Sequence, residues 1–272
     1  MKRLWALCIG AFLGVSGLAA EPRASNETFK INLGGMFVSD FETDLQMGQK
    51  GIPLGAKINT KDQLGMQSET AVFRADAYYR FNDTHSLGLS YYSVKSDSSK
   101  YVPGTIEWNG DTISDAQIQS YFDMTIYELY YGYSFYHNPD IELELTAGLH
   151  VMEISLGLSA QGTVNGVPNE GVDSAASVTA PLPVFGFKGV YYILPKTLSV
   201  TYAAQYFFIQ IDEYKGAFVS NMINLEYQFA EHFGAGVGFS ANTLGLKRTQ
   251  GGTTVDATNT LNGVLAYLSF SY

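Results

Sequence analysis

Nine charged residues and one histidine occur at alternate positions of apolar segments, and they are the residues most able to do chemistry in this chain. Four are basic and five are acidic, so a network built from them would be close to neutral. Such a set could form mutually paired ions, line a selective pore or supply acid–base groups. The candidates are Lys30, Arg74, Asp76, Arg80, Glu128, Glu142, Glu144, Lys188 and Glu226, with His150.

His150 is the candidate for a metal or acid–base centre, because Glu142 and Glu144 share the face of its segment. Along an extended chain of about 3.3 Å per residue, these carboxylates are too far from the imidazole to share one metal ion. We expect a single hydrogen-bonded histidine near the outer end of the interior, with no metal and no cofactor. His85, His137 and His232 fall at predicted turns, where a solvated or interface role is expected.

Composition limits the class of protein that can hold these residues. The chain has 272 residues, with 46% hydrophobic, 14% aromatic and 15% charged residues, and a formal charge of −10. That charge argues against nucleic acid as a partner. A single cysteine excludes a disulfide framework and a cysteine-rich metal site.

The first twenty residues have the order of a secretory signal peptide. Lys2 and Arg3 precede the apolar run 4–15, and small residues follow up to Ala20. We predict cleavage after Ala20, leaving 21–272 as a single domain; the alternative, a membrane anchor, has a short and glycine-interrupted span. No later stretch is apolar for eighteen residues, so an exported chain of this kind is either a soluble periplasmic domain or a closed barrel in the outer membrane.

Alternation favours the barrel. From 70 to 82 the odd positions are apolar or aromatic and the even positions are largely polar, as in a strand with one wet face. Strands of ten or more residues match those that cross a bilayer. We predict an all-β fold, a transmembrane antiparallel up-and-down β-barrel of ten strands, or of eight if two segments form an extramembrane hairpin. The predicted strands are 28–41, 69–82, 85–97, 118–136, 140–157, 183–194, 197–211, 216–230, 233–247 and 259–272.

The connections alternate between short and long. Short turns such as 82–84 and 137–139 are expected on the periplasmic side, and the longer connections 43–68, 98–117 and 158–182 are expected outside the cell. Asn109-Gly110 predicts a hairpin that extends the second connection as a ribbon. The third connection, with Glu170, Asp173 and the small residues 174–177, is expected to be a mobile loop.

The last predicted strand has apolar or aromatic residues at every second position and ends on an aromatic: Val264, Ala266, Leu268, Phe270 and Tyr272. This pattern is similar to the C-terminal strand of bacterial outer-membrane proteins. That resemblance implies outer-membrane localisation, lipid contact and recognition by the barrel-assembly machinery.

Two families of outer-membrane enzymes have catalytic residues that this chain does not repeat at the corresponding places. Omptin proteases resemble one another in an Asp-x-His pair at the outer rim, and here Asp83 and His85 have that spacing but fall in a short turn. Lipid A deacylases carry a late histidine, and none follows His232. The nearest general likeness is to small barrels of the OmpA or OmpW kind.

The interior is expected to be plugged by side chains, because a ten-stranded barrel is only a little wider than an eight-stranded barrel, whose interior side chains fill. Counted from the short turns, Arg80 and Glu142 each stand about two residues along their strands, and Arg74 and Glu128 each stand about eight residues along theirs. Equal heights predict the pairs Arg80–Glu142 and Arg74–Glu128. The alternative is a narrow channel for small solutes, favoured by a slot along 234–238, where every second residue is glycine. An aromatic girdle is predicted near the short turns from Tyr79, Phe81, Tyr131, Tyr133, Phe135, Tyr227 and Phe229.

These observations lead to an expected function. We expect a monomeric, non-enzymatic barrel with a structural or surface-interaction role, whose long connections meet an extracellular ligand that the residues do not identify. A solute channel is the first alternative. A hydrolase embedded in the barrel is the second.

Overall fold

The computed structural model describes residues 27–49, 58–62, 70–108, 111–211, 214–250 and 253–272. The predicted signal peptide 1–20 and the turn residues Asn109-Gly110 lie outside them. Among the described residues there is no helix long and apolar enough to cross a membrane. The strands are β1 (Phe29–Gln49), β2 (Ile58–Asn59), β3 (Thr70–Arg80), β4 (His85–Trp108), β5 (Asp111–His137), β6 (Ile141–Val164), β7 (Val167–Leu194), β8 (Leu198–Ile211), β9 (Tyr214–Gln228), β10 (Phe233–Gln250) and β11 (Thr253–Ser271).

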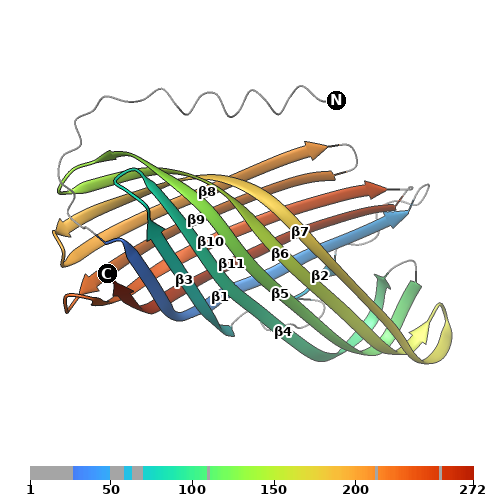
Figure 1. Ribbon diagram of the computed structural model, residues 1–272. Coiled ribbons are helices and arrows are strands. Elements are labelled where there is room, and N and C mark those ends of the chain that lie inside the picture. Colours follow the sequence, from blue (N-terminus) through green and yellow to red (C-terminus); the bar gives the residue numbers. More distant parts are fainter. Residues whose placement is uncertain (1–26, 50–57, 63–69, 109–110, 212–213, 251–252) are drawn as a thin grey trace.

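The ten long strands form a closed antiparallel barrel (Figure 1). Each strand pairs with its neighbours in sequence, and β11 pairs with β1 from Lys30↔Ser271 to Gln49↔Thr253 to close the ring. The two-residue strand β2 pairs with β1 where β3 no longer does. The predicted all-β, up-and-down barrel of ten strands is confirmed, and the eight-strand alternative is wrong.

One end of the barrel carries both described chain ends and the short connections, and we name it the short-turn rim. Its turns are 81–84, 138–140, 195–197 and 229–232, beside Thr28 and Tyr272. In the first turn, the Asn82 Oδ1 accepts hydrogen bonds from the backbone N–H groups of Thr84 and His85, at 2.9 and 3.0 Å. This side-chain cap fixes a tight reversal between β3 and β4.

Away from this rim, strands β4 to β7 continue as a four-stranded sheet of their own. The β3–β4 ladder ends at Arg74↔Tyr92 and the β7–β8 ladder ends at Phe185↔Tyr206, whereas β4 to β7 stay paired with one another almost to their tips. We name this extension, residues 93–108, 111–125, 153–164 and 167–184, the β4–β7 ribbon.

The predicted ribbon within segment 98–117 is confirmed, because 105–108 pair with 111–114 and the two strands continue through the segment. Two other predicted connections are corrected: segment 158–182 is mainly strand rather than loop, and β1 extends to Gln49 into the predicted first connection. The expectation of a mobile third loop is wrong, because β6 and β7 form a hairpin around Asn165 and Gly166, with φ values of 50° and 81°. Two successive positive φ values are those of a type I′ turn, which Asn-Gly favours. The same dipeptide signal that predicts the first ribbon hairpin was present here.

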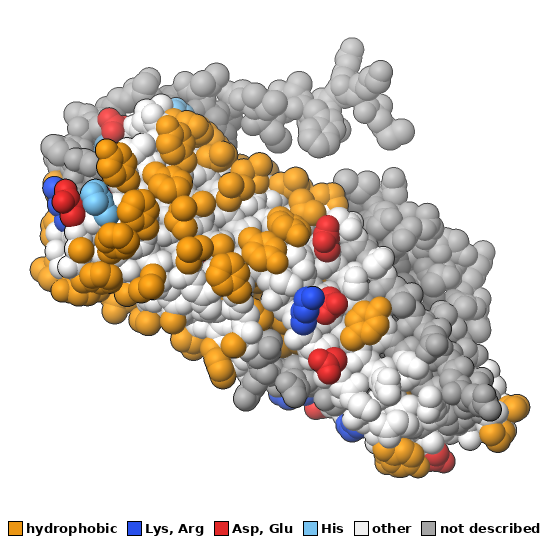
Figure 2. All heavy atoms as spheres, turned by 60° about the horizontal axis from the view of Figure 1, so that its bottom comes forward, with side chains coloured by type: hydrophobic (Ala, Val, Ile, Leu, Met, Phe, Trp, Pro, Cys, Tyr) orange, Lys and Arg blue, Asp and Glu red, His pale blue; other side chains and the backbone are white. Residues whose placement is uncertain are grey.

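The outer face of the barrel is apolar around the short-turn half. Figure 2 shows hydrophobic side chains gathered there, and few of them over the other half. The predicted girdle residues other than Tyr133, which is half-buried, are exposed, as is the apolar side of the last strand up to Tyr272. Phe37, Phe73 and Tyr206 are exposed about eight residues farther along their strands. Eight residues of a tilted strand rise roughly 20 Å, close to the height of a membrane band.

The interior holds an apolar layer that the alternation did not predict. Eighteen hydrophobic side chains among the described residues are at most 7% exposed, and each of the ten long strands contributes at least one. A register shift between Val38 and Asp40 turns Phe41 inward, where its ring meets Phe122 edge-on at 5.0 Å. We name this set the apolar layer; it lies beyond the charged part of the interior and includes the base of the ribbon, to which Val94, Ile118 and Leu182 belong.

Candidate functional site

The predicted charged residues gather in the interior on the short-turn side of the apolar layer. They surround a cavity of about 200 Å³ that extends from Glu27, Lys196 and Gln228 near the rim to His150 and Asn242 near the layer. Eight of the nine charged candidates line this cavity, and the ninth, Glu144, is buried beside it. The interior therefore has a charged half and an apolar half.

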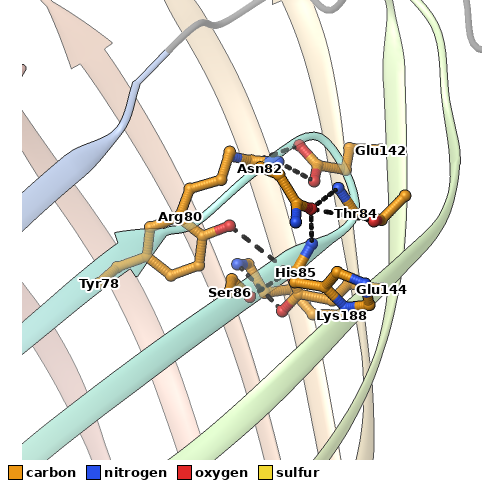
Figure 3. A network of polar contacts seen from close by, with 9 residues as sticks. All are labelled: Tyr78, Arg80, Asn82, Thr84, His85, Ser86, Glu142, Glu144 and Lys188. Carbon is orange, nitrogen blue, oxygen red and sulfur yellow. Dashed lines mark hydrogen bonds and ion pairs between the residues drawn. The ribbon is translucent and has the colours of Figure 1, made fainter.

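Arg80 and Glu142 form a two-bond ion pair at the rim side of the cavity (Figure 3). The guanidinium nitrogens lie 2.9 and 3.1 Å from the two carboxylate oxygens. Arg80 also lies over the Tyr78 ring, 5.5 Å from its centre, which is within the reach of about 6 Å of a cation–π contact. Both side chains stand about two residues from their turns, as the strand heights indicate. The turn capped by Asn82 thus sets the height of Arg80.

Glu144 is held by three neighbours from different strands. The Lys188 Nζ lies 3.5 Å from Glu144 Oε1, and the Ser86 hydroxyl donates to Oε2 at 3.0 Å. The Tyr78 hydroxyl reaches Oε2 at the outer limit of a hydrogen bond, 3.5 Å, and Lys188 lies 4.4 Å from the Tyr78 ring centre. Glu144 and Lys188 are direct cross-strand partners, which keeps this pair in place.

Arg74 corrects a predicted pairing. Its guanidinium binds Asp76 on its own strand, with contacts of 2.9 to 3.1 Å, and lies 5.0 Å from the Tyr92 ring centre. The predicted partner Glu128 instead contacts His150, whose Nε2 is 3.1 Å from Oε1. The height estimate is wrong here because Asp76 is two residues away on the same face, within reach of a side chain that folds back.

His150 and Glu128 are direct cross-strand partners. The spacing of residues along the His150 strand alone, which pointed to Glu142 and Glu144, does not predict this contact. Gln205 also donates to Glu128. The Nε2–Oε1 approach is close, but its geometry is not that of a hydrogen bond, and His150 Nδ1 has no hydrogen-bond partner among the described residues. The imidazole lies 5.0 Å from the Phe218 ring, so His150 marks the boundary with the apolar layer. It lies near the middle of β6 rather than near an outer end.

Lys30 and Glu226 connect the strands on both sides of the barrel closure. The Lys30 ammonium binds Glu226, and the Tyr267 hydroxyl donates to the same carboxylate at 3.1 Å. Because these residues come from β1, β9 and β11, the ion pair crosses the seam where the first and last strands meet.

The glycine slot predicted along β10 is filled. Beside Gly236 lies the ring of Tyr267, and the side chains of Ser269 and Asn224 lie beside Gly234 and Gly238. A side chain at Gly236 would overlap the tyrosine ring, so glycine is needed for close approach rather than to leave a passage.

The described residues hold no group of three or more His, Cys, Asp or Glu suited to a metal ion. His85 lies at the short-turn rim, with its ring 5.8 Å from that of Tyr131 and its Nδ1 2.5 Å from the tyrosine hydroxyl. The Asp83–His85 spacing therefore occurs at the opposite end of the barrel from the ribbon.

No family model and no curated protein matches the chain. Among solved structures, the outer-membrane protease OmpT of Escherichia coli is similar with a TM-score of 0.61 and 13% identity, covering 94% of this chain and 99% of OmpT. The P. putida toluene transporter TodX has a TM-score of 0.34 and 8% identity, covering 91% of each chain. Neisserial surface protein A has a TM-score of 0.31 and 12% identity, covering 90% of this chain and 97% of its own.

At 13% identity, the likeness to OmpT concerns the fold. It agrees with the closed ring of ten strands and with the apolar band on the outer face. The chain has the fold of the bacterial outer-membrane β-barrel proteins, and its apolar band is the surface by which such barrels lie in that membrane.

Proposed function

We propose that this protein is a non-conducting outer-membrane barrel that anchors the β4–β7 ribbon outside the cell as an interaction surface. The apolar layer carries this proposal. Its members come from all ten long strands, and those at its centre, such as Val38, Val94 and Ile118, are fully buried. An ion crossing such a layer would lose its hydration without gaining polar partners, at a cost of several kcal/mol.

Recording from the refolded protein in a planar lipid bilayer tests the closed state. We expect no conductance steps over the voltages at which a porin reference conducts. Stable steps in the wild-type protein would contradict the proposal.

The second candidate is a narrow channel for small solutes. It is supported by the cavity of about 200 Å³ and by the charged residues that line it. A charged lining is more typical of the wall of a selective pore than of a dry core. Conduction would require the apolar layer to separate, because that layer lies across the path beyond His150. The same recording distinguishes the two, and steps whose ion selectivity changes in Glu226→Gln would favour the channel.

We also propose that the barrel is not a hydrolase. The four histidines lie at 85, 137, 150 and 232. Three of them are at turns of the short-turn rim, and the fourth is buried against Phe218. OmpT is a protease by its name, but this chain has no histidine in the ribbon half with which to repeat an Asp-x-His arrangement there. Incubation with unfolded casein tests this, since cleavage above that of the heat-denatured barrel would contradict it.

The proposed orientation puts the short-turn rim in the periplasm and the ribbon outside, with the barrel as a monomer that the assembly machinery inserts through its C-terminal strand. Ser99, in the ribbon part of β4, is exposed and is suited to a label. In intact cells, Ser99→Cys should react with a membrane-impermeant maleimide, whereas Thr197→Cys at the rim should react only after lysis. The reverse pattern would invert the orientation.

A further inference from the structure

The β4–β7 ribbon has two free edges, one on β4 and one on β7. Along 93–108 of β4 and 167–184 of β7, no described strand pairs with the edge that faces away from the other ribbon strands. A free edge exposes backbone donors and acceptors, which another extended chain can pair with, and proteins commonly block such edges with lysine, proline, bulges or covering segments.

The β4 edge carries all of these devices. Lys95, Lys100 and Pro103 lie along it, and the β4–β5 register shifts between Val102 and Thr105. In addition, Lys100 Nζ donates to the backbone carbonyl of Asp62 at 2.7 Å, which brings the segment after β2 against β4. An added strand would meet side chains, a kink and another part of the chain.

The β7 edge is blocked near its ends, by prolines and by a register shift between Asn169 and Val172. Pro168 lies at one end and Pro181 and Pro183 at the other, next to the Phe185↔Tyr206 pair where the β7–β8 ladder stops. Proline has no N–H to offer a new strand. Between them, the twelve residues 169–180 contain no proline and no lysine, and from Val172 to Ala180 each residue is paired with β6. This stretch is long enough for strand addition.

The charge along this edge indicates what would pair with it. Residues 165–187 contain no lysine or arginine, whereas Glu170 and Asp173 fall within the stretch. On the neighbouring strand, exposed Glu153 lies opposite Thr179. A second copy of the chain would bring the same acidic edge and a net charge of −10, which disfavours self-association.

We propose that residues 169–180 of β7 bind an extended, lysine- or arginine-rich segment of a partner protein by strand addition. Backbone hydrogen bonds would supply the pairing, and the acidic residues would select a basic partner over an acidic one. This inference rests on the proposed function, because it requires the ribbon to be displayed as an interaction surface.

A proximity-labelling experiment tests the edge with matched positions. A chain begun at Glu21 has no cysteine, so single cysteines can be placed at Ser177 on β7 and at Ser99 on β4, both exposed serines. The probe is a twelve-residue peptide of alternating lysine and threonine with a maleimide on its central residue. Its acidic counterpart has glutamate in place of lysine. Each labelling rate is divided by that for N-ethylmaleimide, which corrects for intrinsic thiol reactivity.

We expect the basic peptide to label Ser177→Cys about tenfold faster than Ser99→Cys, and the acidic peptide to show no such preference. Glu170→Gln with Asp173→Asn should reduce the preference about threefold to tenfold. Equal rates at the two edges, or equal rates for the two peptides, would overturn the proposal. Disulfide-linked Ser177→Cys dimers that form without peptide and block labelling would assign the edge to a second copy instead. None of these outcomes depends on whether the barrel conducts, so the closed-barrel proposal is tested separately.

Discussion

The two halves of the interior fill the same kind of space in opposite ways. The short-turn half holds paired charges around a cavity of about 200 Å³, and the ribbon-side half holds the apolar layer, in which eighteen of the described hydrophobic side chains are buried. Charged groups must keep their hydrogen-bond partners or water, so they leave space between them. Apolar side chains have no such requirement and can close the space completely.

The difference indicates separate roles for the two halves. Ion pairs such as Arg80–Glu142 and Lys30–Glu226 link strands across the barrel and fix its register. The apolar layer closes the interior where the β4–β7 ribbon begins. If this division is correct, damage to the layer should change permeability, while damage to an ion pair should change mainly stability.

The largest effect is expected from Phe41→Ala combined with Phe122→Ala. Their rings contact each other at 5.0 Å and are at most 2% exposed. Each truncation should cost about 3–5 kcal/mol of unfolding free energy and leave a cavity in the layer. Guanidinium unfolding followed by circular dichroism measures the loss, and bilayer recording should then reveal conductance steps.

Phe73→Ala is the matched control for the double variant. Phe73 is an aromatic residue of the same barrel, but it faces outward and is 57% exposed. Its truncation removes lipid contact and leaves the layer intact, so it should produce no conductance. Steps of similar size in both proteins would mean that the layer is not the barrier.

A smaller effect is expected from Arg80→Met. The change leaves Glu142 buried without its two-bond partner, and we expect a loss of about 2–3 kcal/mol. Exchange of the two residues, Arg80→Glu with Glu142→Arg, should restore part of that loss because the pair is reconstituted. A double exchange no more stable than the sum of its single changes would show that the two groups do not act as a pair.

The sequence was sufficient to assign the charged half because a strand has a period of two. Lys30, Glu128 and Lys188 each stand in a segment whose neighbours are apolar, so one face is unambiguous. The height of Arg80 and Glu142 could be counted from nearby turns. Arg74 could not be assigned in the same way, because its partner depends on a side-chain conformation that spacing does not fix.

The apolar layer could not be predicted from the same rule. In β5, Phe122, Met124 and Ile126 occupy the parity that Glu128 occupies nearer the rim, whereas the other parity carries Asp123 and Thr125, so the apolar side chains change face along the strand. Alternation then fails to separate the lipid from the interior. In β1, the register shift after Val38 reverses which positions face inward. The β6–β7 half of the ribbon was missed for a different reason: its strands there are polar and glycine-rich and so resemble loops.

Gly236→Ala should have an intermediate effect that is specific to the charged half. The added methyl group would overlap the Tyr267 ring, whose hydroxyl donates to Glu226. We expect a loss of about 1–3 kcal/mol as the tyrosine shifts. Gly236→Ala combined with Tyr267→Phe tests the cause. If loss of the Tyr267–Glu226 hydrogen bond explains the effect, the second change should add little, whereas full additivity would attribute it to backbone strain.

The smallest effect is expected at an ion pair outside the barrel interior. Lys247 and Asp256 are cross-strand partners with a contact of 3.1 Å, but their side chains are 42% and 37% exposed. Water and salt screen such a pair, so Asp256→Asn should change the unfolding free energy by less than about 1 kcal/mol, and the change should vanish in high salt. The Arg80→Met loss should persist in the same salt because that pair is enclosed. If both responded to salt equally, the enclosed half would be electrostatically as open as the surface, and the separation of the interior into two kinds of filling would lose its physical basis.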